Sequence, residues 1–191
     1  WLAEEKKSAE VVKMVTSLSD FFRTTLSKGH DYITVKEERT HIESYLEIQQ
    51  FRYQDILDYE IDIPEEMYHY QILKLTLQPL VENAVRHGIE PKAGAGTLYI
   101  GARIEGAALV VSVYDDGVGI PPAELARLQA LLQNPPAGAQ GDHIGLLNVA
   151  CRVRPRYGAG YGLRIESKPG DGTRQILTLP AALPEKEEPL C

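Results

Sequence analysis

The order in which strand-like and helix-like segments follow one another most restricts what this chain can fold into. Five segments have the composition and apolar alternation of β-strands: residues 59–63, 98–104, 109–114, 163–167 and 175–179. Three others place apolar residues at helical spacing: residues 70–87, 121–132 and 145–154. The order β-α-β-β-α-α-β-β joins strands in hairpin pairs, not through repeated β-α-β crossovers. It predicts an α+β fold, a two-layer α/β sandwich with a mixed, mostly antiparallel sheet, and argues against a doubly wound parallel sheet.

Two prolines fall within or next to the predicted helices. Pro79 lies inside the segment 70–87, where its ring is expected to kink the helix or leave one carbonyl group unpaired. Pro155 follows Arg154 and is expected to end the helix that begins near Gly145, because the residue before a proline avoids the helical conformation.

A helical hairpin is predicted ahead of the sandwich. Residues 4–27 lack glycine and proline and carry a seam of apolar residues with a 4-3-4 spacing: Val11, Val15, Leu18 and Phe22. Residues 27–29 (Ser-Lys-Gly) are expected to end this helix. A capping box of Thr34 and Glu37 begins a second helix, which runs to about Tyr53. Two helices cannot bury two faces alone, so we expect a docking surface or a homodimeric four-helix bundle, the alternative being a hairpin packed against its own domain.

Composition narrows the class of protein. Hydrophobic residues make up 43% of the chain, enough for a globular core, and the net charge of −7 argues against nucleic-acid binding, which needs a positive face. No apolar run approaches the ~18 residues of a membrane span, and two cysteines cannot build a disulfide framework, so a cytoplasmic setting is expected. We expect residues 1–56 to form the hairpin, residues 57–180 the sandwich and residues 181–191 a flexible acidic tail.

Three clusters combine polar side chains and glycines in patterns that suit a nucleotide. Asn83, Arg86 and His87 share one helix face, where an amide oxygen suits Mg²⁺ and the nitrogen donors suit phosphate; the alternative is a solvated face. Asp115 ends a strand and is followed by two glycines that allow a flat ligand to approach; the alternative is a common Asp-Gly turn. Residues 141–149 form a glycine-flanked entry into a helix, which is either an anion site or a flexible loop.

Taken together, the motifs resemble those of a known superfamily. The order Glu82-Asn83, Asp115-x-Gly117-x-Gly119-Ile120, Gly145-Leu146 and Gly170-Asp171-Gly172-Thr173 is similar to the N, G1, G2 and G3 boxes of the GHKL ATPases, whose fold is the Bergerat ATP-binding sandwich. The string from Leu77 to Gly88, together with residues 38–53, resembles the LytS/YesM-type bacterial sensor histidine kinases. The resemblance covers about residues 1–180.

The resemblance implies a role for each matching residue. Asn83 would ligate Mg²⁺, and Arg86 and His87 would approach the phosphates of ATP. Residues 134–141 would form a lid over the nucleotide. The remaining implied contacts are Asp115 with the adenine amino group, Gly117 and Gly119 allowing that contact, Ile120 lining the base, Gly145 and Leu146 beneath the triphosphate, and Thr173 near the adenine. Glu82 is the nearby carboxylate that could serve as a general base.

The chain departs from the family pattern in two places. The phosphate-accepting histidine of the family lies in an Asn-Pro-His-Phe motif, which is expected just ahead of Trp1; His41 is the alternative acceptor within the chain. His143 stands where the family has a glycine, before Ile144.

The resemblance predicts the ATP-binding catalytic part of a sensor histidine kinase, with ATP and Mg²⁺ as cofactors. Its partners would be a second copy of the full-length protein and the receiver domain of a response regulator, and any membrane contact would come from a missing N-terminal region. The alternatives are a GHKL protein serine kinase of the anti-sigma-factor type and a catalytically silent, dimerising interaction domain.

Overall fold

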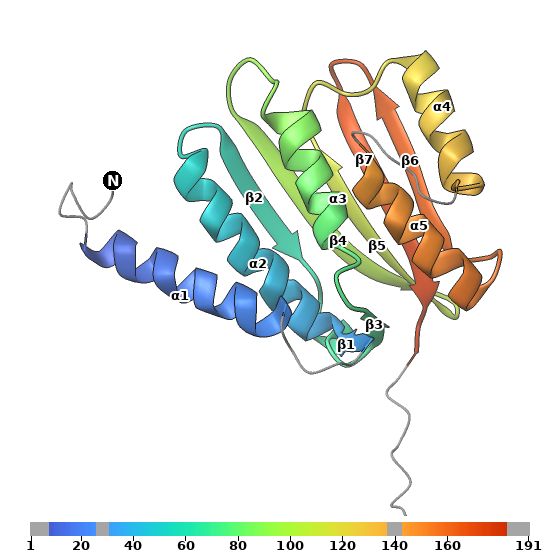
Figure 1. Cartoon of the computed structure of the whole chain (residues 1–191), viewed down its shortest axis with the longest axis horizontal. Coiled ribbons are helices and arrows are strands. Elements are labelled where there is room, and N and C mark those ends of the chain that lie inside the picture. The colour runs from blue at the N-terminus through green and yellow to red at the C-terminus, as the bar shows by residue number, and fades with distance from the viewer. Residues whose placement is uncertain (1–7, 26–30, 137–142, 183–191) are drawn as a thin grey trace, which may run out of the picture.

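A five-stranded sheet forms one layer of the protein and helices form the other. The computed structural model describes residues 8–25, 31–136 and 143–182. The strands lie in the order β2 (Leu57–Asp62), β4 (Gly96–Glu105), β5 (Ala108–Asp115), β7 (Gly172–Pro180) and β6 (Gly162–Lys168). The β2–β4 pair is parallel and the other neighbouring pairs are antiparallel. Figure 1 shows the helices gathered on one face of this sheet, which confirms the predicted two-layer α+β sandwich.

The core lies between the sheet and the helices α2 (Val35–Arg52), α3 (Gln78–Asn83), α4 (Pro122–Gln133) and α5 (Ile144–Tyr157). Alternate residues of the strands point into it, as the two-residue period of a β-strand requires. Fully buried examples on neighbouring strands are Leu98, Leu109 and Leu177, and the helices add Leu46, Leu80 and Leu146. Since α2 shares this core, the second helix of the hairpin is packed against the sandwich.

The hairpin consists of α1 (Ser8–Thr25) and α2, and its first helix leaves apolar side chains in solvent. The capping box at Thr34 and Glu37 is present, which confirms the predicted start of α2. The expected helix end at residues 27–29 lies outside the described residues. Val15, Leu18 and Phe22, three of the four residues of the predicted seam, are 60%, 42% and 50% exposed, so the seam faces away from α2.

The prediction of one helix over residues 70–87 is wrong in its first half. Residues Gln71–Leu73 form strand β3, which pairs antiparallel with β1 (Tyr32–Thr34) in a small second sheet, after a short 3₁₀ turn η1 at Glu65–Met67. The carboxylate of Glu38 then accepts the backbone N–H groups of residues 75–77, which holds this segment in a turn. The helix therefore starts at Gln78, and Pro79 occupies its first turn, where a proline breaks no hydrogen bond and causes no kink.

The helix after Asn83 continues as a wider π-helix, η2 (Ala84–Ile89), and so passes Gly88 by one residue. The prediction that Pro155 ends the following helix is also wrong, because α5 runs through it to Tyr157. Arg156 holds this last turn: its Nε donates to the hydroxyl group of Tyr32 at 2.6 Å, and its guanidinium lies over that ring. Gly158, at a φ of 93°, ends the helix.

Among the described residues, no helix combines the length and the apolar character needed to cross a membrane.

Candidate functional site

Asp115 lies at the end of β5, in the floor of a cavity of about 230 Å³, the Asp115 cavity. Its side chain is fully buried, and its Oδ1 accepts the backbone N–H of Gly117 at 3.0 Å. Its Oδ2 has no hydrogen-bond partner among the described residues. Burial, reinforced by the neighbouring charge of Asp116, raises the pKa of Asp115 to about 7. A buried carboxylate with one free oxygen is suited to a polar ligand group that donates a hydrogen bond.

Glycines bring the backbone against this carboxylate. A Cβ atom on Gly88 would lie 2.2 Å from Oδ1 of Asp115, so no side chain fits between them. Gly117 packs on the backbone of Gly88 with equally little room, and a Cβ on Gly172 would lie 1.9 Å from the carbonyl oxygen of Asp115. At each of these three positions, which come from separate parts of the sequence, a side chain would collide with Asp115 or with the backbone of Gly88.

Asn83, Arg86 and His87 follow one another around the junction of α3 and η2 and line a second cavity of about 160 Å³, the Arg86 cavity. Asn83 is 8% exposed, whereas Arg86 is exposed to solvent. The remaining wall comes from Glu82 and from the first turn of α5. The N–H groups of that turn have no helical partners and favour an anion.

The two cavities adjoin, since Asn83, His87 and His143 line both. The Nδ1 atom of His143 lies 3.1 Å from Oδ1 of Asn83, and its Nε2 lies 3.5 Å from a carboxylate oxygen of Glu124 on α4. The rings of His87 and His143 are 5.2 Å apart. His143 thus ties the start of α5 to both α3 and α4.

The structure brings the residues singled out from the sequence into this one place. The Asp115 cavity is lined by Asn83, His87, Asp115, Gly119, Ile120 and Thr173 from that set. The Arg86 cavity is lined by Glu82, Asn83, Arg86, His87, Gly145 and Leu146. Gly117 lines neither cavity but supports Asp115 from below. Thr173 is held by its hydroxyl group, which lies 2.8 Å from that of Ser167. Most of the predicted lid (residues 134–141) lies outside the described residues, which leave out positions 137–142.

The sequence of the chain matches the models of two known protein families. Residues 69–183 match the family model described as "Histidine kinase-, DNA gyrase B-, and HSP90-like ATPase", and residues 1–57 match the model "Histidine kinase". The chain belongs to this ATPase family. Membership of this family implies that the chain binds ATP.

Relatives of the ATPase domain include named sensor kinases. The chain is 34% identical over 180 residues to the sensor histidine kinase YesM of Bacillus subtilis, covering 94% of this chain and 29% of the relative. It is 34% identical over 175 residues to the sensor histidine kinase BtsS of Escherichia coli, covering 92% of this chain and 28% of the relative. The chain thus spans less than a third of the length of these relatives.

The fold is also that of solved kinase domains. The catalytic domain of histidine kinase ThkA superimposes with a TM-score of 0.56 at 16% identity, covering 82% of this chain and 99% of that one. The mycobacterial sensor histidine kinase MprB gives a TM-score of 0.54 at 20% identity, covering 81% and 99%.

The donor set of the two adjoining cavities suits Mg²⁺ only in company with phosphate. No group of three or more His, Cys, Asp or Glu side chains among the described residues could hold a metal by itself. The amide oxygen of Asn83 is a hard oxygen atom in the shared wall of the two cavities. Mg²⁺ commonly takes one or two protein ligands and completes its shell with phosphate oxygens and water.

Three features in and around the two cavities could not be predicted from the sequence. Gly88 and Gly172 belong to quoted motifs, but their close approach to Asp115 depends on the fold. His143 was read as a departure from the family pattern, whereas in the structure it bonds to the amide oxygen of Asn83. The fully buried Glu38 accepts backbone hydrogen bonds from the turn that leads into α3. Nothing in the sequence around Glu38 predicts this contact.

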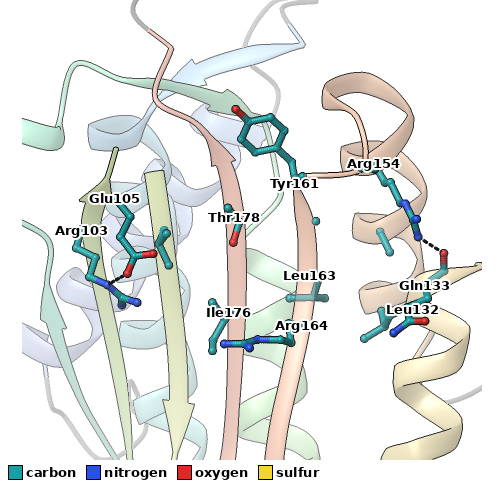
Figure 2. Close-up of a pocket in the computed structure, with 15 residues that line it drawn as sticks. Arg103, Glu105, Leu132, Gln133, Arg154, Tyr161, Leu163, Arg164, Ile176 and Thr178 are labelled. Atoms are coloured by element: carbon teal, nitrogen blue, oxygen red, sulfur yellow. Dashed lines mark hydrogen bonds and ion pairs between the residues drawn. The ribbon is translucent and has the colours of Figure 1, made fainter. Parts of the chain in front are cut away.

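A separate cavity of about 360 Å³ lies toward the other end of the sheet, beside β6, β7 and the final turns of α4 and α5 (Figure 2). Its arginines are already engaged: Arg103 with Glu105 at 2.7 Å, Arg164 with Glu166 at 3.1 Å, and Arg154 with the carbonyl of Gln133. None of the predicted site residues lines it.

Proposed function

We propose that this chain is the ATP-binding catalytic part of a sensor histidine kinase, which transfers the γ-phosphoryl group of Mg·ATP to a histidine outside this chain. The observation that carries the proposal is the free Oδ2 atom of the buried Asp115, in a cavity that also contains Asn83. Mg·ATP carries a purine amino group at one end and a phosphate-bound cation at the other. Asp115 would accept a hydrogen bond from the first, and Asn83 would bind the second.

At the base end, the adenine amino group would donate to Asp115, whose carboxylate accepts only when ionised or correctly oriented. Gly88 lines this cavity beside Asp115 without a side chain, which supports close approach of a ring, and Gly117 holds the carboxylate through its backbone N–H. Ile120 and Thr173 would complete the base site.

At the phosphate end, Asn83 would ligate Mg²⁺, and Arg86 and His87 would donate to phosphate oxygens. Gly145 and Leu146 would present backbone N–H groups from the first turn of α5. Phosphoryl transfer requires little covalent chemistry of a protein, so positioning and neutralisation of charge would dominate. Glu82, in the wall of the same cavity, would be the carboxylate that takes a proton.

The position of His41 supports an acceptor elsewhere. Its ring is fully buried, stacked on Phe21 at 4.6 Å and bonded to Gln78. The match of residues 1–57 to a histidine kinase model favours a histidine over a serine as acceptor.

Partners follow from the same proposal. The exposed stripe on α1 would form the homodimer of the full-length protein, and the phosphoryl group would pass to the receiver domain of a response regulator. A region ahead of this chain would carry the acceptor histidine and connect it to the membrane.

Calorimetry with Mg·ATP tests the site with two variants and one control. Asn83→Ala should remove the part of the ATP affinity that depends on Mg²⁺. Asp115→Asn should lower the affinity for ATP relative to that for GTP. Each loss should be about ten- to a hundredfold, the effect of one lost charged hydrogen bond. Asp116→Asn is the matched control, because Asp116 is half-exposed and paired with Lys92 instead of facing the cavity. Unchanged affinity in both site variants would overturn the assignment. Absence of ATP binding by the wild-type chain, with a concentration-dependent dimer, would instead support an interaction domain.

A further inference from the structure

A line of polar contacts joins the helical hairpin to the Arg86 cavity. The Nε2 atom of the buried His41, on α2, lies 2.7 Å from Oε1 of Gln78, the first residue of α3. The amide nitrogen of Gln78 donates to Oε1 of Glu82, one turn further along α3, at 2.6 Å. Glu82 lines the Arg86 cavity and directly precedes Asn83.

The chemistry of the three groups sets the direction of this line. A carboxylate accepts hydrogen bonds, so the NH₂ group of Gln78 must face Glu82 and its carbonyl oxygen must face His41. The Nε2 atom of His41 must then carry a proton and donate it. The Nδ1 atom has no partner among the described residues, so the bond to Gln78 is the one described hydrogen bond that orients this ring.

The far end of the line is in contact with α1. The ring of Phe21 stacks on His41 at 4.6 Å, with 17° between the planes, and lies 6.3 Å from the ring of Tyr45. Tyr45 follows His41 by one helical turn, and its pKa is raised by burial first and by the charge of Glu82 second. Residues His41 and Tyr45 of α2 therefore lie between Phe21 of α1 and the Gln78–Glu82 pair of α3.

A second tie keeps α2 and α3 in register. The buried carboxylate of Glu38, one turn before His41, accepts the N–H groups of Thr76 and Leu77 at 2.9 and 2.8 Å, immediately before Gln78. This tie fixes the start of α3 on α2. The side chain of Gln78 is therefore the part of this connection that can move. We expect its amide to donate to Glu82 while its carbonyl oxygen accepts from His41.

We propose that Gln78 is a positioning residue that orients the carboxylate of Glu82 in the Arg86 cavity according to how α1 lies on α2. A shift of Phe21 along α2 moves the His41 ring, releases the Gln78 amide and leaves Glu82 without its donor. The effect on nucleotide rests on the proposed function, whereas the effect on Glu82 itself does not.

The test follows the side-chain carboxyl carbon of Glu82 by ¹³C NMR on the 191-residue chain, with Glu82→Gln used to assign its resonance. Gln78→Met keeps the length of the side chain and removes both hydrogen bonds. His41→Phe keeps an aromatic ring against Phe21 and removes the donor nitrogen. Gln175→Met is the matched control, because Gln175 is a buried amide that donates to the carbonyl of Leu80 on the same helix, at 2.9 Å, without touching the hairpin.

The expected result is that Gln78→Met and His41→Phe shift the Glu82 resonance in the same direction, that the double variant shifts it no further, and that Gln175→Met leaves it in place. A Glu82 resonance unmoved by His41→Phe would overturn the proposal, and this variant keeps the test open if Gln78→Met fails to fold. Mg·ATP titration of the same samples adds a separate readout: affinity should fall about threefold to tenfold in both variants. A shifted resonance with no Mg·ATP binding in any sample would uphold the role of Gln78 and refute the proposed function.

Discussion

The Nδ1 atom of His143 donates to Oδ1 of Asn83 at 3.1 Å, and this oxygen is the atom that we propose as a ligand of Mg²⁺. An amide oxygen has two lone pairs and could accept a second partner. However, His143 lines both cavities together with Asn83, so its ring lies on the side from which Mg²⁺ would approach. Binding of Mg·ATP at this oxygen would therefore compete with the contact that holds the start of α5 to α3.

Replacing this ring should strengthen binding. His143→Gly is expected to raise Mg·ATP affinity by about threefold to tenfold, the equivalent of one neutral hydrogen bond that no longer has to be broken. Glycine is also tolerated at a helix N-cap, the position of His143 in α5. Calorimetry measures the change, and repeating the titration in EDTA is the control. An equal gain without Mg²⁺ would show that the ring obstructs the nucleotide and not the ion.

Gly88→Ala should disrupt the base end of the site. The new methyl group would lie 2.2 Å from Oδ1 of Asp115, so the carboxylate or the η2 backbone has to move. We expect a loss of about 1–3 kcal/mol in the free energy of unfolding, typical of overpacking, together with loss of ATP binding. Urea unfolding and calorimetry check both. Gly160→Ala is the control, since a Cβ there meets nothing within 4 Å; an equal loss in that variant would mean that the close contact at Asp115 is not the cause.

The raised pKa of Asp115 predicts a pH-dependent stability. A carboxyl group whose pKa rises from 3.8 to about 7 on folding binds its proton more tightly in the folded protein. Its contribution is therefore fully present below pH 3.8 and is lost as the pH rises toward and through 7, by up to on the order of 4 kcal/mol. Urea unfolding between pH 4 and 8 should show stability falling in the nucleotide-free protein.

Asp115→Asn should flatten this pH profile, because an amide does not titrate. A residual slope of the same sign is expected from Glu38, whose pKa burial also raises. A variant with the full wild-type slope would show that Asp115 titrates near its ordinary pKa. Added ATP should reverse the trend in the wild type between pH 5 and 8, since the adenine amino group favours the ionised carboxylate.

The exposed stripe of α1 should mediate self-association. Phe22→Glu places a charge among apolar residues that are half-exposed in a single chain, and it is expected to lower the association constant by at least about tenfold, the cost of burying one poorly paired charge. Sedimentation equilibrium measures this. Thr16→Glu is the control, because Thr16 is exposed on the same helix but is neither three nor four residues from any residue of the stripe. Equal dimerisation of the two variants would place the interface elsewhere.

Elements with a clear period could be predicted from the sequence, and their ends could not. The segment from Leu98 to Ile104 alternates, and the sequence correctly predicts that it pairs with residues 109–114 in a hairpin. The segment 70–77 has apolar residues at helical spacing, yet it forms a strand and a turn, because its backbone bonds go to β1 and to Glu38. Such partners lie about 40 residues away, and no local pattern reports them.

The same distinction holds for the site. The side chains that we propose for the site, such as Asn83 and Asp115, stand in motifs whose order predicts the superfamily. The surroundings that tune them, such as Gly88 beneath Asp115 or His143 on Asn83, depend on how distant segments pack. Pro79 and Pro155 illustrate the limit: both disfavour a helix interior, but one lies in a first turn and the other in a last turn held by Arg156.

The parallel pairing of β2 with β4 has a mechanical consequence. α2 leads through a short turn into β2, whose residues Leu57–Asp62 pair in register with Gly96–Gly101. A pull along the hairpin would load these bonds in shear, all together, and not peel them one by one. Tyr59 pairs with Leu98, and Leu98 pairs with Asp115, so the three residues form one row across the sheet. Force on the hairpin would thereby reach the row that contains Asp115, the carboxylate that we propose for the adenine, and the edge strand would act as a stiff rod rather than as a hinge.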